Sequence, residues 1–242
     1  MPVARRGRLR ETVVLKGAPI LDGKTWSAGF FQLQGEASQL VSRLLAPSPK
    51  ALVIDCAAAP GGKATHLAEL IGPEGKVLAL DLSFAGLLNV RSTASRLGHR
   101  NVLIARADTS LSLPLRPRSA NFVLLDAPCS GLGTLRQHPE IRWRLSEDRI
   151  ERMAMVQRTM LREAATAVAV GGVLVYAVCS LAPQEGPAII SAFLADNPDF
   201  EIVRRPPAEP LGEIVDSDGC MRTRPDVHGL DGFFAARLTR RS

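Results

Sequence analysis

Two cysteines are the residues of this chain best suited to covalent chemistry. Cys129 stands in "LLDAPCSGLG", three residues after an apolar run that ends at Asp126, and Cys179 stands in "LVYAVCSLAP". A thiolate is a strong nucleophile and can form a covalent intermediate. A single free cysteine is more often a small buried hydrophobic residue, so the pair of motifs, and not either cysteine alone, favours catalysis.

The other two cysteines, Cys56 and Cys220, have no such motif, and we assign them to packing or surface. The four cysteines lack the spacing of zinc ligands. We therefore expect free thiols and no metal site.

A stretch of small residues, "DCAAAPGGKATH", follows the first apolar run. Small residues and glycines between a strand and a helix let a ligand approach the backbone, and the helix N-terminus supplies amide donors. The glycine fingerprint of dinucleotide enzymes is absent, and so is the Gly-Lys-Ser/Thr ending of phosphate loops, because Ala64 follows Lys63. This indicates a nucleoside cofactor without a pyrophosphate, and the residues that we expect to contact it here are Ala58, Ala59, Pro60, Gly61, Gly62 and Lys63.

Each candidate strand ends on a polar or reactive residue. These residues are Asp55, Asp81, Asp108, Asp126 and Cys179. The carboxyl ends of parallel strands share one edge of an open sheet, where ligands bind. A carboxylate at Asp81 suits ribose hydroxyls, and one at Asp108 suits an adenine amine. Together with the small-residue loop, they predict S-adenosylmethionine as the cofactor.

The elements that must position these residues alternate between strand and helix. Buried strands are expected at 51–55, 76–81, 101–108, 121–126 and 171–180, and helices between them at 62–72, 83–98 and 145–172. One more helix at 184–198 and two edge strands at 199–205 and 231–240 follow. This alternation predicts a doubly wound α/β sheet.

The longest expected helix has the clearest signals. Ser146 is placed as its N-cap, and a Gly-Gly pair at 171–172 as its end. Its expected buried stripe is Met153, Val156, Met160, Ala164 and Val168.

Composition and charge limit the class of protein. The chain has 242 residues, 46% of them hydrophobic, and a formal net charge of +6. Arginine far outnumbers lysine, which either reflects genome composition or serves nucleic-acid binding. Arginine clusters stand at 5–10, 136–144 and 240–241. No signal peptide or membrane span is visible, so the expected location is the cytoplasm.

Four stretches together carry a resemblance to a known family. "DCAAAPGGKATHLAEL", "LDAPCSGLGTLRQHPEIRWR", "LVYAVCSLAPQEG" and "HGLDGFFAARL" resemble the RsmB/NOP/Sun family of RNA cytosine-C5 methyltransferases, over roughly residues 29–241. The resemblance implies a class I S-adenosylmethionine-dependent methyltransferase fold, Rossmann-like, with a seven-stranded, mostly parallel sheet whose last strand is antiparallel. It also implies a cytosine in RNA as methyl acceptor, in ribosomal RNA by preference or in transfer RNA.

The same resemblance implies roles for four residues. Cys179 would be the nucleophile that adds to C6 of cytosine, and Cys129 would assist removal of the C5 proton and release of the adduct. Asp126 would hydrogen-bond a cytosine protonated at N3, and Lys63 would organise the site and favour the Cys179 thiolate. Asp126 and Pro128 are also expected to contact the cofactor, and Pro128 to hold Cys129 towards the pocket.

The segment after Cys129 is the expected RNA contact. Its candidate residues are Arg136, His138, Arg142, Trp143 and Arg144. Trp143 could equally be a core anchor, and His138 could be structural. Gly131 and Gly133 are expected to allow close approach of an RNA backbone.

Departures from the family pattern fall early in the chain. Gly35 stands where an aspartate is common, and Ala85 or its neighbours where an arginine is common. We expect a short lead at 1–48 that packs on a catalytic domain at 49–242, acting as a monomer. Two alternatives stay open: a methyltransferase for another acceptor (transfer RNA, an exocyclic amine or a protein), and a noncatalytic RNA-binding scaffold.

Overall fold

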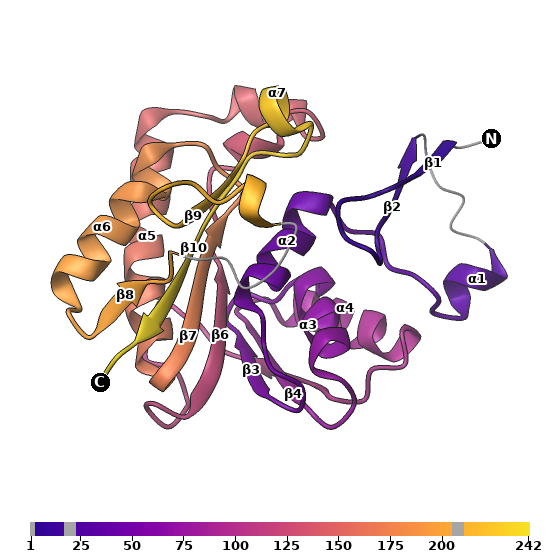
Figure 1. Cartoon of the computed structure of the whole chain (residues 1–242), viewed down its shortest axis with the longest axis horizontal. Helices are drawn as coiled ribbons and strands as arrows, with labels where there is room; N and C mark the ends of the chain where they lie inside the picture. The colour runs from indigo at the N-terminus through magenta and orange to yellow at the C-terminus, as the bar shows by residue number, and fades with distance from the viewer. Residues whose placement is uncertain (1–2, 17–22, 205–210) are drawn as a thin grey trace.

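A central sheet organises the molecule (Figure 1). The computed structural model describes residues 3–16, 23–204 and 211–242. Seven strands pair in the order β5-β4-β3-β6-β7-β10-β8, and β9 pairs with β10. Their bounds are β3 Leu52–Asp55, β4 Lys76–Asp81, β5 Val102–Arg106, β6 Ala120–Asp126, β7 Val168–Val178, β8 Phe200–Ile202, β9 Cys220–Thr223 and β10 Phe233–Arg240.

Strand directions confirm the expected class. β3 is parallel to β4 and β6, β5 to β4, and β7 to β6, whereas β10 runs antiparallel to β7. The parallel strands are rich in Val, Leu and Ile because both faces of the sheet are covered. Their carboxyl ends consequently meet at one edge, as the sequence predicted.

One strand of the central sheet was missed, as were the two strands of the N-terminal hairpin. β9 pairs with Phe233–Ala236 of β10, while β8 pairs with Leu238–Arg240 on that strand. β9 has four residues, "CMRT", with no apolar run to mark it. The sheet therefore has eight strands and not seven. The expected edge strand at 199–205 is shorter than predicted, and Arg205 lies outside the described residues.

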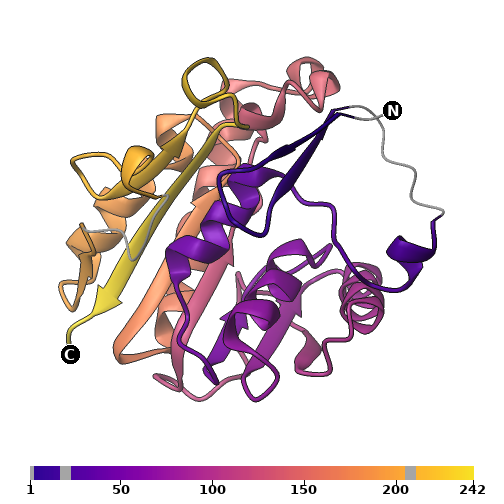
Figure 2. The same cartoon turned by 45° about the vertical axis from the view of Figure 1, so that its right-hand side comes forward.

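Helices cover both faces of the sheet and create two hydrophobic cores (Figure 2). α2 (Glu36–Leu45), α3 (Gly62–Ile71) and α4 (Phe84–Arg96) contribute buried side chains to one core. α5 (Glu147–Thr166) and α6 (Pro187–Asp196) contribute to the other. This three-layer arrangement leaves the carboxyl edge of the sheet between the layers, where the loops carry the candidate site.

The structure corrects the expected face and end of α5. Ser146 caps the helix as predicted, with its hydroxyl accepting from the Arg149 amide. Val156 is 37% exposed, and the buried face is formed by Ala154, Gln157, Met160, Leu161, Ala164 and Ala165. The helix ends at Thr166, so Val168 and the Gly171–Gly172 pair belong to β7, where the β6–β7 register shifts. A positive φ of 74° explains the glycine at 171.

The first 48 residues divide into two parts. β1 (Val3–Arg6) and β2 (Val13–Lys16) form a separate antiparallel hairpin, and the short helix α1 spans Lys24–Ser27. α2, in contrast, buries Leu40, Val41 and Leu45 completely in the core beneath the sheet. The main hydrophobic core thus begins before residue 49. Among the described residues, no helix is both long and apolar enough to cross a membrane.

Candidate active site

Two neighbouring strands bring the two cysteines together. In the β6–β7 register Asp126 lies opposite Ala177, and the chain leaves each strand directly into a cysteine-bearing loop. The Sγ atoms of Cys129 and Cys179 are 3.2 Å apart. Both side chains are partly buried and neither is in a disulfide. The two loops therefore place their thiols side by side, where both can reach the same small region.

The shared hydrogen bond gives the two thiols different acidities. It lowers the pKa of Cys179 below the usual thiol value, opposing the effect of burial, and the Lys63 charge lowers that pKa further. The same bond, together with burial, raises the pKa of Cys129. Of the two thiols, Cys179 is therefore the more acidic.

Lys63 and Asp126 form an ion pair beside the cysteines. The Lys63 Nζ atom lies 2.6 Å from Asp126 Oδ2, with 13% and 26% of the two side chains exposed. Burial alone would lower the pKa of Lys63, but the charges of Asp126, Asp55 and Cys179 raise it overall. The ammonium also lies 5.6 Å from the centre of the Phe233 ring. Lys63 therefore brings a fixed positive charge to the cysteine pair.

Asp55 is a buried acid that the sequence-based site omitted. It is 1% exposed, and neither carboxylate oxygen has a hydrogen-bond partner among the described residues. Burial, reinforced by the neighbouring Asp126 charge, raises the pKa of Asp55 to about 7. An unpaired buried carboxylate is costly, and it suits a cationic group of a ligand. Asp55 was identified from the sequence as the polar end of a candidate strand, here β3, but it was assigned no role in the site.

The expected cofactor loop borders a cavity of about 390 Å³. Six of the expected contact residues line it: Ala58, Ala59, Pro60, Gly62, Lys63 and Asp126. Sequence reasoning missed the polar residues opposite, which include Gln34 and Ser38 near the start of α2 and Asn89 on α4. The cavity thus lies between the loop, α2 and α4, with a lining that is part polar and part apolar.

Two glycines let this loop lie close to α4. Gly61 has φ 112°, and a Cβ added there would lie 2.9 Å from the Val90 Cα atom. A Cβ on Gly86 would lie 2.7 Å from the Ala59 Cβ atom. A side chain at residue 86 would therefore collide with the loop. The arginine that the family commonly has in this region has no space at that position.

The other expected cofactor contacts do not line the cavity. Asp81 accepts from the amides of Ala59 (3.0 Å) and Ser83 (2.8 Å), so it holds the loop against β4. Asp108 accepts from the Ser110 amide and hydroxyl. Pro128 is exposed, and its carbonyl accepts from Gln157. Their contact with a cofactor stays a prediction.

The expected RNA-contact residues lie on the mostly exposed stretch 136–144, which contains the 3₁₀ helix Pro139–Trp143. Another 3₁₀ helix, Leu132–Thr134, precedes this stretch. Trp143 is 80% exposed, so the reading as a core anchor is wrong. The Arg142 guanidinium lies 5.1 Å from the centre of its ring. Arg136 is more constrained, because it donates to the Gly229 carbonyl and lies 3.5 Å from Asp231. His138 and Arg144 are exposed.

The interpretation of Gly133 as space for RNA is wrong. A Cβ on Gly133 would lie 1.8 Å from the Gly232 carbonyl oxygen, and Gly232 donates to the Gly133 carbonyl at 2.8 Å. This close approach is internal to the protein and joins the Cys129 loop to the segment before β10. Gly131 has φ 77°, which explains a glycine in that turn.

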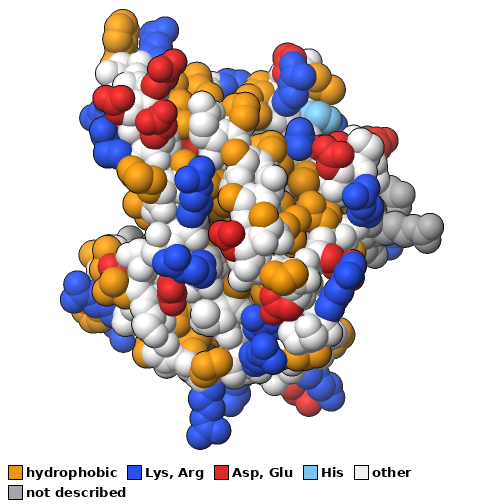
Figure 3. Space-filling view, turned by 90° about the vertical axis from the view of Figure 1, so that its left-hand side faces the viewer, with side chains coloured by type: hydrophobic (Ala, Val, Ile, Leu, Met, Phe, Trp, Pro, Cys, Tyr) orange, Lys and Arg blue, Asp and Glu red, His pale blue; other side chains and the backbone are white. Residues whose placement is uncertain are grey.

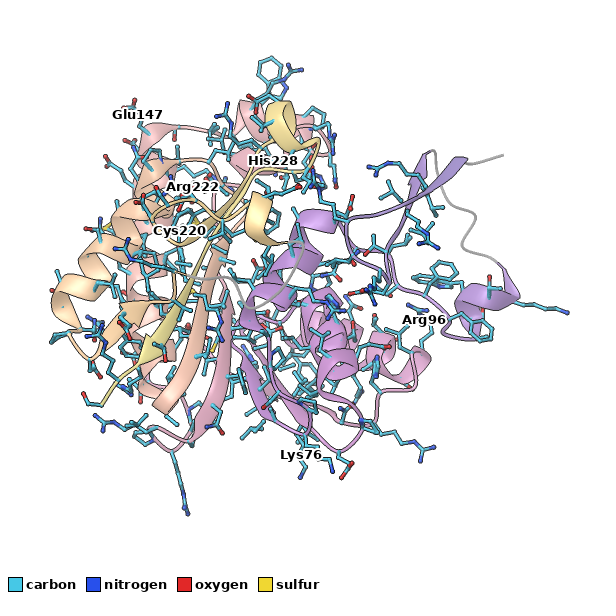
Figure 4. The ribbon with its side chains drawn as sticks, in the orientation of Figure 1. Lys76, Arg96, Glu147, Cys220, Arg222 and His228 are labelled. Atoms are coloured by element: carbon cyan, nitrogen blue, oxygen red, sulfur yellow. The ribbon has the colours of Figure 1, made fainter. Side chains whose placement is uncertain are left out.

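Cys56 and Cys220 are buried, in agreement with their assignment to packing. Burial raises the pKa of both thiols, that of Cys220 to about 11. Cys220 lies on β9, close to Arg222 on the same strand (Figure 4). Within residues 3–16, 23–204 and 211–242, no cluster of metal ligands is present.

Comparisons with known proteins agree with this geometry. The family described as 16S rRNA methyltransferase RsmB/F matches residues 42–239. The probable ribosomal RNA small subunit methyltransferase B of Synechocystis is 35% identical over 94% of this chain and 54% of its own length. The corresponding Thermus thermophilus protein, named ribosomal RNA small subunit methyltransferase B, is 37% identical over 94% of the chain and 56% of its own length.

A solved structure extends the likeness to three dimensions. The crystal structure of NSun6 from Pyrococcus horikoshii with SFG superposes with a TM-score of 0.84 at 30% identity, over 94% of this chain and 58% of that one. The chain spans about half the length of the curated relatives it matches. With the fold, the cysteine pair and the family match in agreement, the chain belongs to the RsmB/F family of 16S rRNA methyltransferases.

Proposed function

We propose that this chain transfers a methyl group from S-adenosylmethionine to C5 of a cytosine in RNA. The observation that carries the proposal is the pair of thiols 3.2 Å apart, one with a lowered and one with a raised pKa, beside the Lys63–Asp126 ion pair. A methyltransferase for an exocyclic amine or a protein side chain has no use for two such cysteines.

The chemistry requires a nucleophile because C5 of cytosine is itself a weak one. The Cys179 thiolate adds to C6, and the electron pair of the C5–C6 bond becomes available at C5. Lys63 holds Oδ2 of Asp126, which directs the other oxygen, Oδ1, to a proton on cytosine N3. That hydrogen bond stabilises the negative charge that addition at C6 places on the ring.

S-adenosylmethionine supplies the electrophilic methyl group when it is bound. After transfer, C5 carries both a proton and the methyl group. Cys129 assists this step as the base: after it has lost its own proton to solvent, its thiolate accepts the C5 proton. The electron pair of the C5–H bond forms the C5–C6 double bond again, and the bond from C6 to Cys179 Sγ breaks with its electron pair on the sulfur. The thiolate of Cys179 is thereby regenerated.

The residues around the cavity fit the cofactor. The Ala58–Lys63 loop offers backbone contacts along the cavity. Asp55 does not line the cavity, but its carboxylate lies buried and unpaired at the end of β3, and we propose it as the charge that attracts the ammonium of the amino-acid end. Asp81 and Asp108, at the next two strand ends, are proposed for the ribose and the adenine. Asp81 already accepts two amide protons, but each carboxylate oxygen has a further lone pair.

The proposed RNA contact is the exposed segment from Arg136 to Arg144. Arg142 and Arg144 would contact phosphates, and Trp143 offers an accessible ring on which an unstacked base can stack. On the face of the molecule that carries α6, basic side chains are scattered among acidic and apolar ones (Figure 3).

We propose small-subunit ribosomal RNA as the substrate, because the curated relatives carry that name. We propose a monomer as the active form, because one chain supplies both cysteines.

Transfer of label from S-adenosylmethionine tests the proposal. Protein is incubated with deproteinised ribosomal RNA and, separately, with transfer RNA, and the RNA is digested to nucleosides. We expect labelled 5-methylcytidine from ribosomal RNA and none with Cys179→Ala. Label in another nucleoside, or in the protein, would support a different acceptor, and cofactor binding without any transfer would contradict catalysis by this chain.

A further inference from the structure

Glu185 is a fully buried acid that the proposed chemistry does not use. It ends the 3₁₀ helix Pro183–Glu185, five residues after Ser180, and its side chain is 0% exposed. The carboxylate accepts four hydrogen bonds, from the Ser130 amide (2.7 Å), the hydroxyls of Ser130 and Ser180, and Gln157 Nε2 (3.0 Å).

The two serines connect this carboxylate to both catalytic loops. Ser130 follows Cys129 and Ser180 follows Cys179 in the chain. Their hydroxyl oxygens are 3.2 Å apart, a separation like that of the two sulfur atoms. One carboxylate thus joins the loop after β6 to the loop after β7, one residue beyond each thiol.

Two further side chains tie the carboxylate to the rigid part of the fold. Gln157, on α5, donates both to Glu185 and to the Pro128 carbonyl at 2.9 Å. The Tyr176 hydroxyl, on β7, lies 2.6 Å from the Glu185 carbonyl oxygen and 3.1 Å from Gln157 Oε1. All three side chains are buried.

A buried carboxylate is expensive, since it loses its hydration and must recover the loss through well-aligned donors. Apolar side chains of similar volume would pack this space without that cost. A buried polar network instead fixes one arrangement of the groups that it joins, which matters when two reacting groups must keep a set separation.

We propose that Glu185 is a positioning residue that sets the separation and orientation of the Cys129 and Cys179 thiols. The inference rests on the proposed function in one respect, that the two thiols act in turn on the same base. The geometric part concerns the thiols alone and holds for the protein without RNA.

The first test measures thiol proximity without any RNA. Dibromobimane becomes fluorescent when its two arms join two nearby thiols, and peptide mapping identifies the joined pair. We expect rapid joining of Cys129 to Cys179 in the wild type, none in Cys129→Ala, and a rate about tenfold lower in Glu185→Ala, because loss of the carboxylate releases both loops.

Two variants separate positioning from stability. Glu185→Gln keeps the shape and most hydrogen bonds, and should retain a joining rate within about threefold of the wild type. Asp199→Ala breaks the 2.7 Å ion pair between Asp199, just before β8, and Arg240 on β10, and serves as the control for general destabilisation. Thermal unfolding and cofactor binding are measured for each, so that a variant that does not fold is recognised; in that case Ser130→Ala and Ser180→Ala replace Glu185→Ala.

The second test follows the covalent protein–RNA adduct over time. We expect Glu185→Ala to form the adduct but release it about 100-fold more slowly, since a displacement near 1 Å can cost that much, with the KM for S-adenosylmethionine unchanged. Joining rates and adduct release equal to those of the wild type in folded Glu185→Ala would overturn the inference. If the wild type transfers no methyl group to RNA and Cys129→Ala forms no adduct, the proposed function fails, while the dibromobimane result still decides the role of Glu185.

Discussion

The Cys129 loop of the cysteine site is followed directly in the chain by the proposed RNA-contact segment. The two regions differ in burial and in how their charged side chains are held. Around the cysteines, Lys63, Asp126 and Asp55 are largely buried and held by charge or by close packing. From Arg136 to Arg144 the side chains are exposed, and Trp143 is 80% so. Buried charges interact strongly, and their side chains can adopt few conformations. Exposed charges are screened by water and salt, so that one can replace another with little effect.

This contrast predicts large, specific effects at the first region and small, graded effects at the second. A substitution among the buried groups should change a pKa or a chemical step. A substitution on the exposed segment should change RNA affinity and leave the folded protein intact. The following predictions test this difference in order of expected size.

Removal of the Lys63 charge should have the largest effect. In Lys63→Met the cation that lowers the pKa of Cys179 is lost, so the pKa of Cys179 should rise and methyl transfer should fall about 1000-fold. The rate of Cys179 alkylation by iodoacetamide, measured against pH, reports this pKa directly. Lys50→Met, which removes an exposed pair with Glu74, is the control. An alkylation profile at the wild-type position would refute the assigned role of Lys63.

Asp55 should make the stability of the cofactor-free protein depend on pH. Its folded pKa of about 7 lies above the usual 3.8, so the folded state binds the proton more strongly. The stability contributed by this group is therefore present below about pH 4 and is lost as pH rises towards 7. Asp55→Asn should raise the free energy of unfolding at pH 8 by about 2–3 kcal/mol. Urea unfolding at pH 5 and pH 8 provides the measurement, and a variant less stable than the wild type at pH 8 would contradict this description.

Trp143→Ala should weaken RNA binding by about 1–3 kcal/mol, the range for one base stacked on an aromatic ring. Its melting temperature should not change, because the ring is exposed. Fluorescence anisotropy with a labelled RNA fragment and a thermal melt make the two measurements. A lowered melting temperature with unchanged affinity would assign Trp143 to the fold instead.

Arg142→Ala and Arg144→Ala should have the smallest effects. Each should reduce the slope of log affinity against log salt by about one, as expected for loss of a single phosphate contact. Affinity measured at several salt concentrations gives this slope. Arg204→Ala, outside the segment, should leave it unchanged, and an equal change in all three variants would argue against a localised RNA contact.

The sequence predicted the parts of the fold that depend on local pattern. Apolar runs located the parallel strands, and Ser146 located the start of α5. It did not locate β9, whose "CMRT" is stabilised by pairing with β10 and has no pattern of its own. The buried stripe of α5 was misplaced in part because Gln157 is buried for its hydrogen bonds, a property that hydrophobic periodicity does not register.

The candidate site was predicted where motifs carry it, and missed where tertiary contacts create it. Cys129, Cys179, Lys63 and Asp126 do meet in the structure. Glu185 was quoted within a motif, but its role depends on the approach of two loops that only the folded chain provides. Gly133 was misinterpreted for the same reason, since its neighbour Gly232 is distant in sequence.

Trapping of the covalent adduct tests the division of roles between the two thiols most directly. Wild type, Cys129→Ala and Cys179→Ala are incubated with ribosomal RNA and S-adenosylmethionine, then separated on denaturing gels. We predict a stable protein–RNA adduct that carries the methyl group in Cys129→Ala and none in Cys179→Ala. An adduct that persists in Cys179→Ala, or that accumulates there and not in Cys129→Ala, would reverse the assignment and contradict the account.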